Sequence, residues 1–236
     1  MPIAEVAGQR ATAFTHSATD DSRTLAFPGS VVAGNLLAVL GVNWRSSNNG
    51  GSGLISVSDT LGTVYTVLNS PQIASEYRSF IAFGHAPSSG ACTVTVDPEG
   101  VNNVMSFSID EFSGVGKPPL EADGGSGTGT STHAERNVTS LFNGALLFGV
   151  MGVVPFTDPV GMTPDPYYTQ IGEHEDNNTA TAHNAVYRVA GGPGVYQVGW
   201  SLGASYNWFA YAAAVQEVPV TVPTAPIYGS RVPVMA

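Results

Sequence analysis

The sequence predicts an all-β protein with antiparallel sheets, and three observations lead to that fold class. Apolar and polar residues alternate over short stretches, which is the period of a half-buried strand. Turn-forming residues are frequent, with 28 Gly and 16 Pro among 236 residues. No stretch of useful length combines the i, i+3, i+4, i+7 spacing of an amphipathic helix with capping residues.

Two kinds of strand are expected from these patterns. Residues 91–96 and 105–111 alternate between apolar and polar side chains, so each should bury one face. Residues 36–42 and 145–151 are instead continuously apolar, which is typical of a central strand covered on both faces. Cys92, the only cysteine, falls in an alternating stretch and is expected to be a buried, unreactive thiol.

Similar segments recur in the same order in the two halves of the chain. Residues 34–37 (Gly-Asn-Leu-Leu) are echoed by residues 144–147 (Gly-Ala-Leu-Leu). At a shared offset of roughly 105 residues, four more segments match: 65–68 with 168–171, 83–84 with 187–188, 91–96 with 195–200, and 105–111 with 209–215. The common order predicts two copies of one supersecondary unit.

The repeat divides the chain into four regions. We expect a first sandwich copy at residues 1–115, a Pro/Gly/Ser-rich junction at 116–130, a second copy at 131–218 and an extended C-terminal arm at 219–236. The Gly/Ser/Thr tract at 124–132 predicts a junction that is flexible or weakly paired. Two architectures fit: two tandem antiparallel jelly-roll-like sandwiches, or one larger concanavalin-like sandwich whose sheets both copies share.

Composition argues against two classes of partner. The net charge is −10, charged residues make up 11% of the chain, and no run of Lys or Arg occurs. Nucleic acid and anionic membrane surfaces both require clustered positive charge, so neither is expected as a partner. The N-terminal residues lack the basic and apolar regions of a signal peptide, and we expect synthesis in a cytoplasm without secretion.

The C-terminal arm is apolar for the end of a chain, since Arg231 is its only charged residue. An arm of this composition is expected to lie either against a neighbouring subunit or against its own protein, and the sequence leaves both open. The candidates for a partner contact are its large apolar side chains, Ile227, Tyr228, Val232, Val234 and Met235.

No arrangement in the sequence suggests catalysis. The histidines are scattered and no Gly-x-Ser-x-Gly elbow occurs, so we predict no catalytic residues, no resident metal and no cofactor. The densest group of possible metal ligands, Glu-His-Glu-Asp at residues 173–176, is interpreted as a solvated turn.

The tryptophans are the candidates for a binding surface. Flat aromatic rings stack on sugars, and Trp200 and Trp208 are expected to lie near each other. Trp44, Trp200 and Trp208 are therefore a possible glycan platform, with packing in the core or at a subunit contact as the alternative.

Several of these segments together resemble a known family. They are residues 34–37, the D-x-x-G-x-x-Y turn at 59–65, the Asp-Glu-Phe-Ser-Gly-Val ending at 110–115 and the Pro/Gly-rich bridge that follows. The combination resembles a two-copy β-sandwich family of tailed-phage virion proteins and prophage-encoded surface proteins, over residues 10–218. The second copy departs from it, because Asp-Pro-Tyr-Tyr at residues 165–168 replaces the turn and residues 214–218 replace the ending.

The resemblance implies a role in a virion. It implies a structural protein, a decoration or auxiliary protein of a phage capsid, which acts by surface adhesion and lattice contacts. The partners it implies are the major capsid protein or other virion subunits, with the protein itself forming a homo-oligomer. The alternative is a glycan- or host-surface-binding module of a phage tail or fibre.

Overall fold

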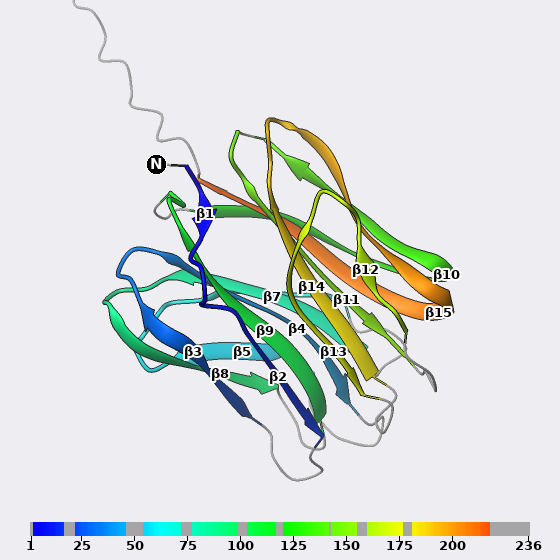
Figure 1. Ribbon diagram of the computed structural model, residues 1–236, viewed down its shortest axis with the longest axis horizontal. Coiled ribbons are helices and arrows are strands. Elements are labelled where there is room, and N and C mark those ends of the chain that lie inside the picture. The colour runs from blue at the N-terminus through cyan, green and yellow to red at the C-terminus, as the bar shows by residue number, and fades with distance from the viewer. Residues whose placement is uncertain are drawn as a thin grey trace, which may run out of the picture.

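The chain folds into three antiparallel β-sheets, as the computed structural model in Figure 1 shows. The structure describes residues 2–16, 22–45, 54–71, 77–98, 103–116, 120–141, 143–154, 160–176 and 181–217. Within these ranges every regular element is a strand, so the all-β prediction is confirmed. None of the described segments is a helix long and apolar enough to cross a membrane.

Sheets A and B are built from the first half of the chain. Sheet A has the order β1–β9–β4–β7–β6, and β2 also pairs with β9. Its strands are β1 (Ala4–Glu5), β2 (Ala11–His16), β4 (Leu36–Arg45), β6 (Thr66–Asn69), β7 (Tyr77–His85) and β9 (Asn103–Ser113). Sheet B has the order β3–β8–β5, formed by β3 (Arg23–Val31), β8 (Gly90–Pro98) and β5 (Ile55–Asp59).

Sheet C is built from the second half. Its order is β10–β15–β11–β14–β13, and β12 also pairs with β15. The strands are β10 (Leu120–Ser140), β11 (Leu146–Val153), β12 (Thr163–Pro164), β13 (Thr169–Asp176), β14 (Thr181–Val189) and β15 (Gly194–Glu217). No described sheet contains strands from both halves, so the shared sheets of the alternative architecture are not formed.

The sheets stack in layers, with sheet A between sheets B and C (Figure 1). One core lies between sheets A and B and includes Phe80 and Phe107. A second core lies between sheets A and C and includes Leu40 and Phe148. Sheet A is therefore covered on both faces, which explains the continuously apolar sequence of β4.

The strands of the first half pair in a nested order. β2 pairs with β9, β3 with β8, and β4 with β7, as in a long antiparallel ribbon folded over on itself. This nesting is that of a jelly roll, in which the folded ribbon supplies both layers of a sandwich. It agrees with the jelly-roll-like fold expected from the sequence.

The second half reaches the same order with longer, bent strands. The first part of β10 pairs with the last part of β15, and the last part of β10 pairs with the first part of β15. A register shift between Ser131 and His133 separates the two parts. The far part of this β10–β15 ribbon covers the outer face of sheet C, and the core between them includes Leu147, Met151 and Trp200.

The turn before each central strand is built the same way in both halves. Gly34 and Gly144 have φ of 85° and 74°, a region that glycine adopts readily. Gly34 donates its N–H to the Ala86 carbonyl at 2.8 Å, and Gly144 donates to the Ala190 carbonyl at 3.1 Å. These matched segments therefore occupy equivalent places, while the duplication itself stays a prediction.

The sequence alignment of residues 105–111 with residues 209–215 is wrong by one residue. It matches Glu111 with Val215. In sheet A, Glu111 lies opposite Leu37, whereas in sheet C it is Ala214 that lies opposite Leu147. Because successive side chains point to opposite faces, this error exchanged inward and outward positions. The strand order was predicted correctly and the alignment of this strand was wrong.

The expected junction also differs. Residues 120–131 belong to β10 and pair with residues 206–217 of β15, so the prediction of a flexible or weakly paired tract is wrong. Its glycines have a packing role: a Cβ on Gly129 would lie 2.7 Å from the Trp208 ring, and one on Gly124 would lie 2.9 Å from the Tyr211 hydroxyl. The Gly/Ser/Thr composition therefore predicted a linker, whereas in the structure these small residues make room for the large side chains of Trp208 and Tyr211.

Candidate functional site

The three tryptophans predicted as a glycan platform do not form one exposed surface. Trp200 is 0% exposed, and its indole N–H donates to Asn184 Oδ1 at 3.0 Å. Trp208 is partly buried against the same core and donates to Ser131 Oγ at 2.9 Å. Trp44 lies near the end of β4 in sheet A. A joint platform is therefore wrong, and Trp200 takes the packing role offered as its alternative.

The predicted partner-contact arm lies outside the described residues. This applies to all five of its candidate side chains, Ile227, Tyr228, Val232, Val234 and Met235. Their contact with a partner stays a prediction.

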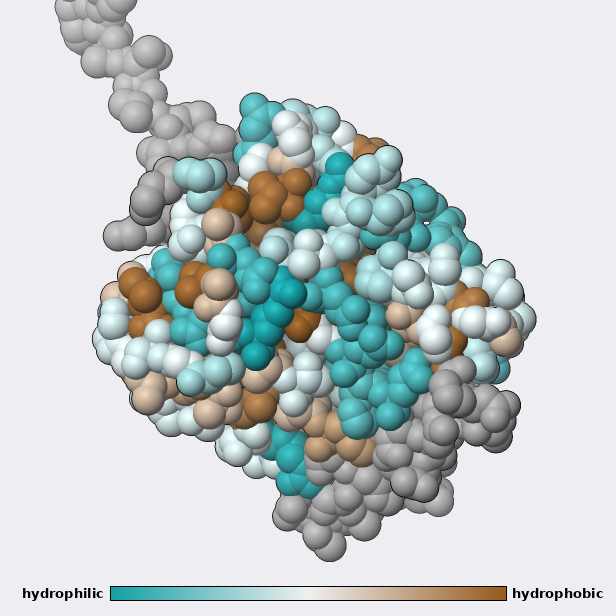
Figure 2. Space-filling model, viewed as in Figure 1, coloured by the Kyte–Doolittle hydropathy of each residue, from teal (hydrophilic) through white to brown (hydrophobic). Residues whose placement is uncertain are grey.

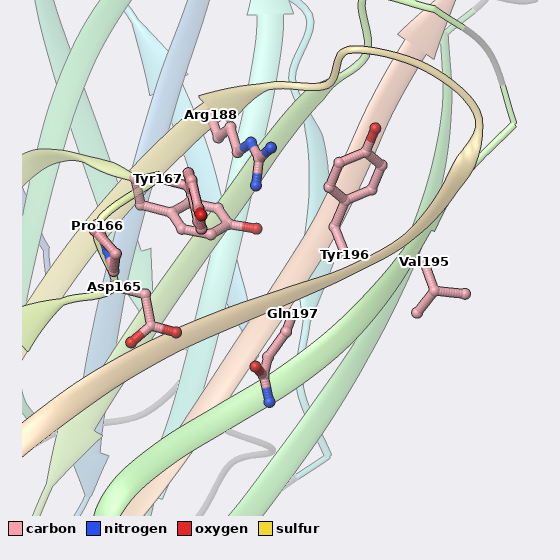
Figure 3. A pocket seen from close by; sticks show the side chains of 8 residues that line it. Asp165, Pro166, Tyr167, Arg188, Val195, Tyr196 and Gln197 are labelled. Carbon is pink, nitrogen blue, oxygen red and sulfur yellow. The ribbon is translucent and has the colours of Figure 1, made fainter.

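A surface hollow of about 270 Å³ lies in the second half of the described part of the chain and is the candidate binding site. Figure 3 shows the residues that line it, which come from the turn between β12 and β13, from β14 and from the start of β15, with the rings of Tyr167 and Tyr196 near Arg188. The turn contributes Asp165, Tyr167 and Tyr168, β14 contributes Arg188, and β15 contributes Tyr196 and Gln197.

Arg188 is the centre of this hollow. Its guanidinium carbon lies 5.0 Å from the ring centroid of Tyr167, 5.8 Å from that of Tyr168 and 5.1 Å from that of Tyr196. A cation this close to an aromatic ring is stabilised by roughly 0.5–2 kcal/mol, depending on its exposure to water. The three rings therefore hold the guanidinium in place while part of its hydrogen-bonding capacity stays available.

The three tyrosines differ in exposure. Tyr167 is 72% exposed, whereas Tyr168 is buried in the core. Burial raises the pKa of Tyr168 to about 12, against the opposing effect of the Arg188 charge. Tyr196 is fixed from outside the hollow, because its hydroxyl donates to the Gly192 carbonyl at 2.7 Å. The ring of Tyr167 is therefore accessible to a ligand, whereas the rings of Tyr168 and Tyr196 are fixed in place and pack around Arg188.

Polar groups complete the rim. Asp165 is positioned by its backbone, whose N–H donates to the Gly199 carbonyl at 3.0 Å. Its Oδ2 lies 3.9 Å from His133 Nε2. The Gln197 side chain donates to the Glu135 carboxylate. The hollow therefore offers a carboxylate, an amide and a guanidinium beside one exposed aromatic ring.

The corresponding turn in the first half is organised by Asp59. Its Oδ1 accepts hydrogen bonds from the N–H groups of Leu61 at 2.9 Å and Thr63 at 3.1 Å, and its Oδ2 accepts one from the Tyr65 hydroxyl at 2.9 Å. Burial alone would raise the pKa of Asp59, but hydrogen bonds from Thr63, Tyr65 and Leu61 outweigh burial and lower it. The D-x-x-G-x-x-Y motif is thus a closed, self-bonded turn.

Comparison of the two turns explains why the hollow around Arg188 has no counterpart at the first-half turn. Gly84 lies opposite Leu37 in sheet A, and Arg188 lies opposite Leu147 at the equivalent place in sheet C. A Cβ on Gly84 would lie 2.5 Å from the Val64 carbonyl oxygen, so the first-half turn packs directly on that glycine. In the second half Arg188 occupies the position equivalent to Gly84. The Asp-Pro-Tyr-Tyr turn, which is shorter than the first-half turn, surrounds its side chain.

A separate polar cluster joins the two halves between sheets A and C. Arg10 donates to Asp110 Oδ2 at 3.0 Å, to the Gln170 carbonyl at 2.6 Å and to the Glu5 carboxylate. The Tyr187 hydroxyl donates to the same Glu5 carboxylate at 3.1 Å. Burial and the Glu5 charge raise the pKa of Asp110 to about 7, although Arg10 opposes them.

A fully buried histidine lies in the same interface. His183 Nδ1 is 2.6 Å from Ser106 Oγ, and its Nε2 is 3.1 Å from Ser108 Oγ. Burial lowers the pKa of His183 to about 3, so the ring is neutral. All three side chains are closed off from solvent, so this cluster ties the sheets together and reaches no ligand.

The acidic cluster expected to be a solvated turn lies in strand β13, so that interpretation is wrong. Glu175 accepts from the Val160 and Gly161 N–H groups at 3.1 and 3.0 Å, whereas the neighbouring His174 ring stacks on Phe14 at 3.9 Å. In the described ranges no three His, Cys, Asp or Glu side chains are grouped so that they could hold a metal ion. Cys92 is buried, as predicted, and burial raises its pKa to about 12.

The residues of the hollow were missed as a site, although the sequence held a signal for them. The Asp-Pro-Tyr-Tyr segment at 165–168 was noted as a departure from the first copy, and Gly84 aligned with Arg188. A local departure from an internal repeat indicates a place where the second copy does something else. No family model matches the chain, and comparisons with curated proteins and with solved structures found no similar one.

Proposed function

We propose that this protein is a virion component that acts by surface contact, and that the Tyr167–Arg188 hollow is its recognition site for a saccharide. The observation that carries this proposal is the exposed Tyr167 ring beside the side chains of Asp165, Arg188 and Gln197. The virion setting rests on the sequence resemblance alone. The hollow takes over the binding role that the sequence had assigned to the tryptophans.

Saccharide is the ligand class that this chemistry favours. A sugar ring has an apolar face of C–H groups, which stacks on an aromatic ring, and a rim of hydroxyls, which both donate and accept hydrogen bonds. Asp165 accepts, Arg188 donates, and Gln197 does both. The volume lies near the lower end of the ~300–1,000 Å³ typical of ligand sites, so we expect one terminal sugar ring to enter.

The test is a glycan array followed by calorimetric titration of the selected saccharide. Tyr167→Ala should weaken binding by about tenfold or more, equivalent to roughly 1.4 kcal/mol, because it removes the stacking ring. Val64→Ala, at an 89% exposed side chain in the first half, is the matched control and should bind as the wild type does. Silence of the array, or equal binding by the Tyr167 variant, would remove this proposal.

A second candidate is a structural role on the capsid, as a decoration or auxiliary protein. It is favoured by the sheet edge at β10, whose residues 124–132 carry no charge and which suits assembly with a virion subunit or with sister copies. The measurement is cosedimentation of the purified protein with capsids that lack it, with saturation at a fixed copy number. Protein that stays in the supernatant at every concentration counts against this role.

A further inference from the structure

Arg188 brings a positive charge into the hollow without an acidic side chain to neutralise it. The residue is half-buried, and none of the carboxylates in the described part of the chain lies within ion-pair distance of its guanidinium. Arg10 is the contrasting case, because its guanidinium is paired with Glu5 and Asp110 and is therefore already occupied. The charge of Arg188 remains available to a ligand.

The two ends of the hollow differ in charge. Figure 3 shows the side chains of Asp165 and Gln197 on the side of the hollow away from Arg188. The Asp165 carboxylate faces His133, with 3.9 Å between Asp165 Oδ2 and His133 Nε2, and Glu135 lies at the same end, 3.5 Å from that nitrogen. One end of the hollow therefore presents a cation among tyrosine rings, and the other presents carboxylate acceptors.

A carboxylate is the ligand group that suits the cationic end. A guanidinium has five N–H donors in one plane and no acceptor. A carboxylate can accept two of these N–H groups in parallel, and such charge-assisted bonds are roughly twice as strong as bonds between neutral groups. The rings of Tyr168 and Tyr196 pack around the guanidinium and exclude water from part of it, which strengthens its attraction to an anion.

We infer that the preferred ligand is an acidic saccharide, a sugar ring that bears a carboxylate as hexuronic and sialic acids do; this inference rests on the saccharide site proposed above. The carboxylate projects from the edge of such a ring, whereas C–H groups lie on its faces, so one sugar can contact Arg188 and Tyr167 together. Its hydroxyls donate to Asp165 at the opposite end. The two charged ends thereby fix the direction in which the sugar binds.

The wild-type protein gives the first test, with ligands that differ in a single group. The probes are the methyl glycosides of glucuronic acid and of N-acetylneuraminic acid. Each is compared with two neutral counterparts, the primary amide of the acid and the alcohol formed by its reduction. Calorimetric titration should give about tenfold or more higher affinity for the acid than for either neutral form, equivalent to roughly 1.4 kcal/mol. The acid that binds more tightly identifies the kind of sugar that supplies the carboxylate.

Variants assign this preference to Arg188. Arg188→Gln removes the charge, so the preference for the acid over its amide should fall by about tenfold. Arg188→Lys keeps the charge but loses the planar pair of donors, so it should retain part of the preference. Arg136→Gln is the matched control, because it removes the same charge at an exposed arginine of β10 that does not line the hollow, and its preference should equal that of the wild type.

Two results would overturn the inference and leave the saccharide site standing. One is a wild-type protein that binds neutral saccharides as tightly as their acids, on the array and in the titrations. The other is a preference for the acid that Arg188→Gln leaves intact, since another cation would then bind the carboxylate. A glycan array on which no saccharide binds, acidic or neutral, would instead remove the proposed site itself, so the two failures are distinguishable.

Discussion

The two halves of the molecule use the same order of paired strands but build their outer layer differently. In the first half, sheet B consists of strands separate from those of sheet A. In the second half, β10 and β15 continue through a bend and supply both layers themselves. The same order of paired strands can therefore be built from separate strands, as in the first half, or from continuous strands that bend, as in the second.

The turns differ more than the layers do, and the second turn surrounds the hollow that we propose as a saccharide site. Asp59 closes the first turn with three hydrogen bonds, and the turn packs on Gly84. The second turn has three tyrosines around Arg188 instead. The first turn is therefore closed by its own hydrogen bonds, whereas the second leaves an exposed ring beside Arg188. Four predictions test this comparison.

The largest effect is expected from the core between the halves. Phe148 is 0% exposed and contacts Phe112 edge-on at 5.5 Å. Phe148→Ala should lower the free energy of unfolding by about 3–5 kcal/mol, and both halves should still unfold in one transition. Urea denaturation followed by tryptophan fluorescence and by circular dichroism measures this, with Phe80→Ala in the outer core as the reference. Two separate transitions in the wild type would show that the halves are independent.

The next effect concerns the two turns. Asp59→Ala leaves the Tyr65 hydroxyl and two backbone N–H groups without their acceptor, so we expect a loss of about 2–3 kcal/mol. Asp165→Ala should cost under about 1 kcal/mol, because that side chain makes no comparable set of bonds. The pKa of Asp59 is lowered on folding, so its contribution is present above about pH 4 and disappears as the pH falls through its lower folded value. Chemical denaturation measures the free energy of unfolding of both variants. Equal losses for Asp59→Ala and Asp165→Ala would contradict the expected difference between the two turns.

A smaller effect is expected at the strand position beneath each turn. Gly84→Ala should cost about 1–3 kcal/mol, because its Cβ would meet the Val64 carbonyl and Thr63. Arg188→Ala should cost less, about 1 kcal/mol, since Arg188 and Tyr167 are partly exposed to water, which weakens the contacts of the guanidinium with the tyrosine rings. Thermal unfolding of the pair measures the difference. A reversed order would mean that the hollow is mainly a structural feature.

The last prediction is a pH dependence that arises at Asp110, in the polar cluster between sheets A and C. Asp110 has a folded pKa of about 7, above the ordinary value near 4, so the folded protein binds the extra proton more tightly. Stability should therefore fall as the pH rises from about 4 to 7 and level off above that range. Asp110→Asn should flatten this part of the curve, which denaturation at a series of pH values measures. An unchanged slope would assign the dependence to another group.

Local sequence patterns predicted most of the fold. Residues 36–42 and 145–151 were expected to be central strands, and β4 and β11 are central because layers cover both of their faces. The matched glycines at 34 and 144 occupy equivalent turns with the same backbone hydrogen bonds. Periodicity and turn chemistry act over a few residues, so one sequence suffices to read them.

Features that depend on distant contacts could not be predicted in the same way. The glycines of residues 124–132 resembled a linker because Trp208 and Tyr211, which they accommodate, lie far away in the sequence. The role of Trp200 was open until its ring was placed in a core. The hollow combines residues 165–168 with Arg188 and Tyr196, and only the pairing of β14 and β15 with their neighbours brings these together.

The central claim is that Arg188, at the place in β14 where β7 has Gly84, forms the proposed saccharide site. The most direct test is calorimetric titration of the array-selected saccharide into the wild type and into Arg188→Gly, which gives β14 the residue found at the equivalent place in β7. The account predicts at least tenfold weaker binding by the variant, with its melting temperature within a few degrees of the wild type, roughly 2–4 °C for a chain of this size. Equal affinity of the two proteins for the saccharide would contradict it.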